Sequence, residues 1–157
     1  MKTKFITAMV VSMTVVFFSF INASNNDDRV SEDEQAVKSL VLGAYVNGAF
    51  NKLDAESMEQ GFHKDFAIYS PKGDEISKYK IADWVAGVKK RRDGDYDANA
   101  AKNKWEHKFA AVDVTGHAAQ VKIELHNQGK HVYTDYLSLL RFGDDWKIVA
   151  KVYYKHD

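Results

Sequence analysis

The 157-residue sequence contains no cysteine, and it has only one proline. Without cysteine there can be no disulfide bond, thiol nucleophile or cysteine-ligated metal. The 22 Lys and Arg residues equal the 22 Asp and Glu residues, so no net positive charge favours nucleic acid or an anionic membrane. The motifs G-x-S-x-G, G-x-x-x-x-G-K-[ST] and G-x-G-x-x-G are missing too, which leaves hydrolase, nucleotide and dinucleotide functions without support.

The composition that is present indicates a folded domain. Apolar residues make up 45% of the chain and aromatic residues 13%, more than an intrinsically disordered chain carries. The length suits one domain with its own core. No internal repeat and no shift in composition divides the chain. We therefore expect a single domain.

The N-terminal residues 1–23 have the pattern of a signal peptide. Lys2 and Lys4 precede an apolar run over residues 5–21, and the small residue Ala23 offers a cleavage point. An uncleaved membrane anchor is the alternative, but the run is at the lower limit of about 17 residues for a spanning helix. We expect cleavage, export to the periplasm or beyond, and no stable membrane insertion. A polar lead-in would follow over 24–30 and the domain over 31–157.

The pattern of the domain predicts helices first and strands afterwards. A capping box at Ser31 begins a helix over about 31–49, and Asp54 caps a short helix over 55–60. A strand over 62–70, a short return strand from Ile76 and a third helix capped by Ser77 follow. The polar segment that comes next mixes basic and acidic residues, which indicates a solvated loop and not a nucleic-acid patch. Four further strands are predicted over 104–114, 118–127, 131–142 and 146–155. This order is typical of an α+β fold.

The register of the last hairpin decides which side chains face the core. If Phe142 lies opposite Trp146, the core face carries Tyr136, Ser138 and Leu140, while Asp135 and Leu137 face outward. On that outward face Asp135 and Lys151 become diagonal neighbours, as a surface ion pair or as part of a subunit interface. A bulge would invert the assignment.

The preceding hairpin raises the question of a metal site. Pairing Val114 with Ala119 places His107 opposite His126, with Glu124 nearby, and two histidines plus a carboxylate can ligate zinc. No H-x-H or H-E-x-x-H motif supports this reading. A polar outer sheet face is the favoured interpretation, and no metal or cofactor is predicted.

Four segments carry a resemblance to a known family. They are AYVNGAF at 44–50, FHKDFAIY at 62–69, VDVTGHAAQVKIEL at 112–125 and YTDYLSLLRFGDDWKIVAKVYY at 133–154. With them the chain resembles the putative lumazine-binding family of the nuclear-transport-factor-2-like superfamily. The resemblance implies a cone in which three N-terminal helices pack on a strongly curved antiparallel sheet. It also implies a pocket for small apolar or aromatic molecules, and dimers.

Related members of the superfamily include ketosteroid isomerases, SnoaL-like polyketide cyclases and dehydratases, so the resemblance leaves the function open. The candidate ligand-binding residues of the cone are Tyr45, Phe62, Phe66, Tyr69, Trp84, Tyr136 and Ser138. For the aromatic residues among them, plain core is the favoured alternative. His63 and Asp135 are the candidate catalytic bases, with Tyr45 or Tyr136 as proton donor. For His63, a surface position beside Asp65 is the favoured alternative.

Three functions follow as hypotheses. The first is an exported module that holds a small apolar or aromatic molecule in its cone. The second is an enzyme of the isomerase, cyclase or dehydratase type. The third is an oligomerising module, a homodimer through an outer sheet face formed by Leu137, Leu139, Val149 and Tyr153.

Overall fold

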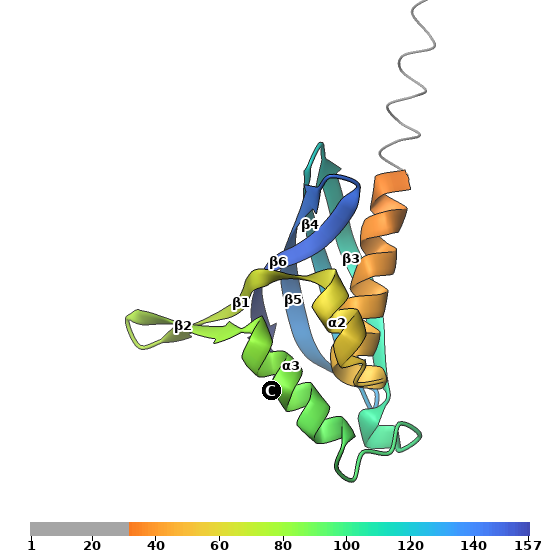
Figure 1. Ribbon diagram of the computed structural model, residues 1–157. Helices are drawn as coiled ribbons and strands as arrows, with labels where there is room; N and C mark the ends of the chain where they lie inside the picture. The colour runs from red at the N-terminus through yellow and green to blue at the C-terminus, as the bar shows by residue number, and fades with distance from the viewer. Residues whose placement is uncertain (1–31) are drawn as a thin grey trace, which may run out of the picture.

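The computed structural model describes residues 32–157. The predicted signal peptide, the lead-in at 24–30 and the capping residue Ser31 lie outside the described residues. A long helix starts the described chain (Figure 1): residues 32–40 are α-helical and continue into the π-helix η1, Val41–Asn51. At its end the Lys52 amide donates to the Asn47 carbonyl, five residues back, at 2.8 Å. The helix predicted over 31–49 is confirmed, and its second half has the i→i+5 hydrogen bonds of a π-helix in place of those of an α-helix.

The second helix and first strand also match their predicted positions. Helix α2 spans Ala55–Gly61, and the Asp54 side chain caps it by accepting from the Ser57 amide at 3.1 Å. Strand β1 follows over Phe62–Lys72 and pairs with β2, Glu75–Lys80, in a hairpin that projects from the body (Figure 1).

The predicted start of the third helix was wrong. Helix α3 spans Ile81–Arg92, and no side chain caps its first turn. Ser77 lies in β2 opposite Ser70. A short helix η2, Ala101–Asn103, interrupts the polar segment that follows. Strand pairing overrides the local capping signal at Ser77, because extending the hairpin provides hydrogen-bond partners for several backbone N–H and C=O groups at once.

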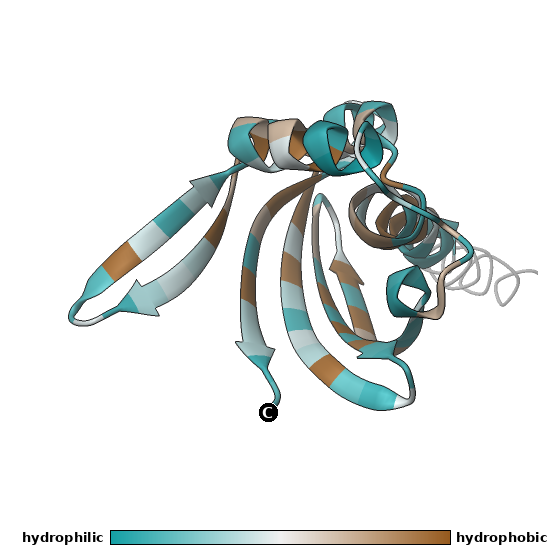
Figure 2. Cartoon of the chain, turned by 90° about the horizontal axis from the view of Figure 1, so that it is seen from below, coloured by the Kyte–Doolittle hydropathy of each residue, from teal (hydrophilic) through white to brown (hydrophobic). Residues whose placement is uncertain are grey.

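The remaining strands complete one sheet. They are β3 over Trp105–Thr115, β4 over Ala118–Asn127, β5 over Lys130–Phe142 and β6 over Asp145–Lys155. The sheet order is β2-β1-β6-β5-β4-β3, with β1 parallel to β6 and all other neighbours antiparallel. The sheet is strongly curved and does not close, and the helices cover its inner side (Figure 2). Within residues 32–157, no helix is long and apolar enough to cross a membrane.

The facing predicted for the last hairpin was inverted. The predicted pairing of Leu137 with Lys151 is present, but a bulge between Ser138 and Leu139 makes Leu139, not Leu140, the partner of Ile148. Leu137 and Leu139 are buried in the core, whereas Leu140 is 41% exposed. Because the bulge adds one residue to β6, Ile148 joins the same face as Leu137, and this face is the inner one. Trp146 and Ile148 are buried as expected; the strand opposite them was assigned to the wrong side.

A second bulge changes the other hairpin. Val114 pairs with Ala119 as predicted, but the register shifts between Phe109 and Ala111. His107 therefore lies opposite Leu125 and not opposite His126. The inner face of the curved sheet carries Val114, Ala119, Val121, Ile123 and Leu125 from this hairpin and packs on the helices.

Candidate ligand-binding site

Three polar side chains meet inside the apolar core. The Tyr45 hydroxyl from η1 donates to Asp135 Oδ2 on β5 at 2.5 Å and accepts from Lys151 Nζ on β6 at 2.6 Å. Lys151 Nζ also lies 2.8 Å from Asp135 Oδ1. Tyr45 and Asp135 are fully buried, and Lys151 is 5% exposed. The three groups, here called the buried triad, contact one another inside the core; Asp135 Oδ1 has the Lys151 ammonium group beside it but, among the residues that the structure describes, no hydrogen bond of good geometry.

The secondary structure places each member of the buried triad. Asp135 pairs with Tyr153, and Lys151 with Leu137, so Asp135 and Lys151 are diagonal neighbours on one face of β5 and β6. Tyr45 reaches them from the π-helical half of the first helix. π-Helical hydrogen bonding is rare, and where it occurs within a helix it is frequently at a functional site.

Burial governs the electrostatics of the buried triad. Desolvation raises the pKa of Tyr45 well above 10.0, and the negative charge of Asp135 raises it further. Desolvation lowers the pKa of Lys151 below 10.5, while the ion pair with Asp135 opposes that effect. The ammonium group and the carboxylate compensate each other, which is what makes two ionised groups tolerable in an apolar core.

Aromatic rings enclose the amine of Lys151. Its Nζ lies 4.8 Å from the ring centre of Tyr45, 5.0 Å from that of Tyr153 and 5.8 Å from those of Trp84 and Tyr133. Such distances are within the range of cation–π attraction. Trp84 and Tyr133 are half-buried and Tyr153 is 41% exposed, so these three rings, the aromatic ring set, stand between the amine and solvent.

Four of the predicted pocket residues lie together beside the buried triad. Tyr45, Phe62 and Phe66 are buried, and Trp84 packs against all three. The ring centres of Phe62 and Phe66 lie 4.7 Å apart in an edge-to-face arrangement. These rings fill the interior of the cone, as expected for aromatic side chains that also form core.

The other three predicted pocket residues do not face the cone. Tyr136 and Ser138 lie on the outer face, where Tyr136 is 44% exposed and Ser138 accepts a hydrogen bond from Gln120. Tyr69 pairs with Val152, which is 50% exposed on the same face. For Tyr136 and Ser138 the reason is the inverted facing of β5: these side chains were predicted to point inward and point outward, and Asp135 and Lys151 take the inner face.

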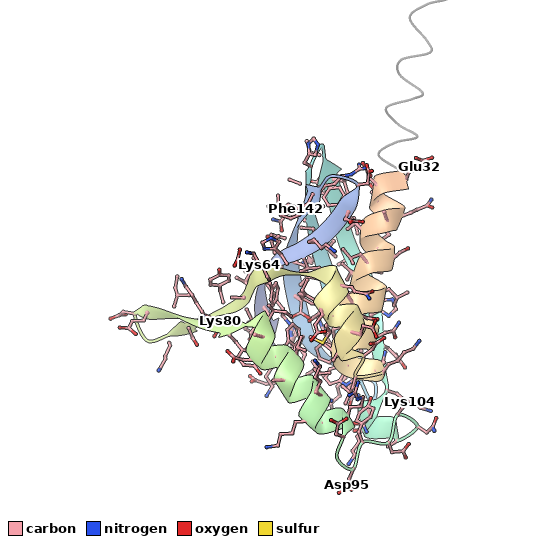
Figure 3. The ribbon with its side chains drawn as sticks, in the orientation of Figure 1. Glu32, Lys64, Lys80, Asp95, Lys104 and Phe142 are labelled. Atoms are coloured by element: carbon pink, nitrogen blue, oxygen red, sulfur yellow. The ribbon has the colours of Figure 1, made fainter. Side chains whose placement is uncertain are left out.

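The two candidate bases occupy different environments. Asp135 lies in the core and touches Tyr45, a predicted donor. His63 lies on the rim of the sheet, 3.6 Å from the exposed Asp65 carboxylate, and its ring stacks on Phe142 at 4.9 Å. Phe142 is labelled in Figure 3. His63 thus has the surface environment that we favoured for it.

Sequence reasoning did not assign Lys151, Tyr133 or Tyr153 to the site. Lys151 was expected beside Asp135, but on the surface. The signal that could have found it is its diagonal partner Asp135, since a lysine is almost never fully buried unless it is paired.

Two surface hollows lie away from the buried triad. One of about 280 Å³ is on the sheet, lined by residues such as Asp113, Gln120 and Leu140. The other, of about 520 Å³, lies between the first helix, α2 and β6, lined by residues such as Leu40 and Lys147. Neither of these two hollows contains a member of the buried triad.

A family model described as "Putative lumazine-binding" matches residues 32–154, which is most of the chain. The chain belongs to this family. The resemblance noted in the four sequence segments is therefore confirmed. The matched range includes all members of the buried triad and of the aromatic ring set. No curated protein matches the chain.

Solved structures of nuclear-transport-factor-2-like proteins share the fold. One from Silicibacter pomeroyi is 21% identical with a TM-score of 0.61, covering 80% of this chain and 98% of its own. One from Shewanella baltica is 22% identical with a TM-score of 0.62, covering 81% and 96%. One from Methylobacillus flagellatus is 24% identical with a TM-score of 0.59, covering 80% and 94%. All three are described as proteins of unknown function, so the likeness establishes the α+β cone and no activity.

Proposed function

We propose that this member of the putative lumazine-binding family binds a small, planar, apolar or aromatic molecule that carries one hydrogen-bond acceptor. The observation that supports the proposal is the buried ammonium group of Lys151 behind the partly exposed rings of Trp84, Tyr133 and Tyr153. Ligand sites are usually apolar and aromatic, with a few convergent polar groups that fix orientation.

The buried triad supplies the polar group. An ammonium group has three N–H donors, and within residues 32–157 Lys151 has two polar contacts, with Tyr45 and Asp135. The third donor is directed to the ligand's acceptor, while the ligand's plane stacks on the aromatic ring set. Because Asp135 and Tyr45 hold the amine in place, little side-chain entropy is lost on binding.

Fluorescence titration with a panel of planar aromatic molecules, lumazine among them, tests this proposal. Tyr133→Leu removes one ring that faces Lys151, and we expect it to weaken binding about tenfold, since a stacked ring contributes roughly 0.5–1.5 kcal/mol beyond its burial. Tyr136→Leu is the matched control, because it removes a tyrosine from the outer face of the same strand. Failure of the whole panel to bind, or equal weakening by both variants, would overturn the proposal.

A second candidate function is proton transfer, in which Asp135 acts as base and Tyr45 as donor. The direct hydrogen bond between the Tyr45 hydroxyl and the Asp135 carboxylate favours it. His63 and Tyr136 lie away from this pair and take no part. Deuterium exchange beside the carbonyl of a cyclic ketone, followed by NMR, tests this function: exchange that the wild-type protein catalyses should be lost in Asp135→Asn, and exchange retained in that variant excludes Asp135 as the base.

We also propose that residues 1–23 direct export and that the mature chain forms a homodimer. Lys2, the apolar run over 5–21 and Ala23 support export. Mass spectrometry of the protein recovered outside the cytoplasm should find a mature N-terminus near Ser24; an intact Met1 would contradict it. The argument for a dimer rests on the exposed apolar side chains of the outer sheet face.

A further inference from the structure

The outer face of the sheet carries a second cluster of polar side chains, on the other side of the sheet from the buried triad. Glu124 and His126 lie on β4 and His131 on β5, and one ligand-capable atom from each lies within 4.8 Å of the others. All three side chains are half-buried. His131, and not the predicted His107, is the neighbour of His126 across the strands. We propose that Glu124, His126 and His131 bind a divalent transition-metal ion such as Zn²⁺.

The ring of His131 is held in one orientation. Its Nε2 lies 3.0 Å from the Tyr133 carbonyl oxygen and 3.0 Å from Thr134 Oγ1. Because a carbonyl oxygen can only accept, Nε2 carries the proton, and the free lone pair of the neutral ring is on Nδ1. A histidine that donates one N–H to a backbone carbonyl and offers its other nitrogen is the usual arrangement of a metal-binding imidazole.

Neighbouring groups restrain the cluster further. The rings of His126 and His131 stack with their centres 4.7 Å apart, and the ring of His156 lies 3.9 Å from that of His131. Thr134 Oγ1 lies 2.9 Å from His156 Nε2, so the buried Thr134 side chain bridges His131 and His156. The ligands thus project from two paired strands and not from a loop, which favours a defined geometry.

The ligand set fits a borderline-soft divalent cation. Two imidazoles and one carboxylate bind Zn²⁺ at about 2.0–2.2 Å, with a fourth position left for water or another ligand. Glu124 Oε2 lies 3.5 Å from His126 Nε2 and 3.5 Å from Lys108 Nζ. The Lys108 side chain is 70% exposed, so it is free to move into solvent as the cation takes its place beside the carboxylate. Because the rings of His126 and His131 lie within 17° of parallel, the His126 ring must rotate for the lone pairs of both rings to point at one ion.

Calorimetric titration of the untagged, chelator-treated full chain with ZnCl2 tests the site. We expect one Zn²⁺ per chain, and Co²⁺ should give the visible absorption of a tetrahedral ion. His126→Ala and His131→Ala should each weaken Zn²⁺ binding at least about tenfold. His107→Ala on β3 and His117→Ala in the β3–β4 turn remove exposed histidines and should leave it unchanged.

Three outcomes would overturn the proposal: no Zn²⁺ bound at micromolar concentration, unchanged affinity in the two cluster variants, or equal loss in the His107 control. Far-ultraviolet circular dichroism shows whether each variant is folded. Should His131→Ala unfold because Thr134 loses its partner, Glu124→Gln gives the same test, since it keeps the size of the side chain and removes only the anionic ligand. Unchanged Zn²⁺ affinity in Glu124→Gln would equally reject the site.

Discussion

At the residue scale, the buried triad is costly unless all its groups are paired. Removing an ion from water costs several kcal/mol even after relaxation, and apolar replacements of buried ion pairs are often as stable or more so. Here Lys151 contacts both Asp135 and Tyr45, and Tyr45 contacts both of its partners. Stability alone does not account for three polar groups in the core, and we therefore interpret them as functional.

The buried triad predicts a particular response to alkaline pH. Lys151 has a lowered pKa in the folded state, so as pH rises toward 10.5 the folded state loses this proton before the unfolded state does. The contribution of Lys151 to the free energy of unfolding therefore increases with pH over this range. Tyr45 has a raised pKa, so above 10.0 the unfolded state loses its proton first and stability decreases. Above about pH 10.5 the decrease from Tyr45 is the remaining contribution of the buried triad, with a slope of up to ~1.4 kcal/mol per pH unit. Tyr96 and Tyr133, whose pKa values burial also raises, act in the same direction in both proteins compared below.

Urea unfolding between pH 9 and 12 measures this effect, with Tyr45→Phe as the comparison. The variant lacks the hydroxyl and should be less stable at neutral pH by roughly 1–3 kcal/mol, because Asp135 and Lys151 lose a buried partner. Its free energy of unfolding should then fall less steeply than that of the wild type above pH 10.5. Parallel curves for the two proteins in this range would show that Tyr45 does not titrate as its burial requires.

At the element scale, two bulges separate what the sequence predicts from what it does not. The helices, the hairpin at Phe62–Lys80 and the four final strands follow local signals, and the structure places them within a few residues of their expected bounds. The facing of Asp135 does not follow, because both faces of β5 are apolar enough to be core: Tyr136 and Leu140 on one, Leu137 and Leu139 on the other. A single extra residue in β6 decides between them, and its energy depends on tertiary packing.

The close approach of α2 to the first helix depends on a glycine. A Cβ atom added at Gly61 would lie 2.2 Å from the Ala44 Cβ, a distance that real side chains do not reach. Ala44 precedes Tyr45, so this contact also fixes the helix that carries the buried triad. The approach of the two helices is therefore possible only with glycine at position 61.

Gly61→Ala should destabilise the protein by about 1–3 kcal/mol, the usual cost of overpacking a core. Gly43→Ala is the matched control, because Gly43 lies in the same helix as Ala44 and a Cβ there would meet nothing within 4 Å. We expect Gly43→Ala to be neutral or to stabilise by up to ~1 kcal/mol, through helix propensity. Thermal unfolding of both variants compares them; a destabilisation of similar size in both would refute the role of close packing at Gly61.

At the scale of the whole molecule, the two faces of the curved sheet carry different kinds of side chain. The inner face carries the buried triad and the aromatic ring set. The outer face carries the Glu124 cluster and exposed apolar side chains, among them Tyr136 at 44%, Val152 at 50% and Tyr154 at 61% exposure. Tyr136 pairs with Val152 across the strands. Exposed apolar patches on a soluble domain commonly mark an interaction site.

We expect a second copy of the chain to cover this outer face. Leu137 and Leu139, which we first assigned to the interface, are buried within the subunit, so Tyr136, Val152 and Tyr154 replace them. Light scattering at micromolar concentration should give the mass of a dimer. Val152→Lys places a charge in the patch and should shift the species to a monomer, because an unpaired charge in an interface is costly. Ile76→Lys, at a 67% exposed position on the projecting hairpin, should leave the dimer intact. A monomeric wild-type protein would mean that the outer face binds a different partner. Dissociation by Ile76→Lys but not by Val152→Lys would mean that the dimer interface lies elsewhere on the molecule.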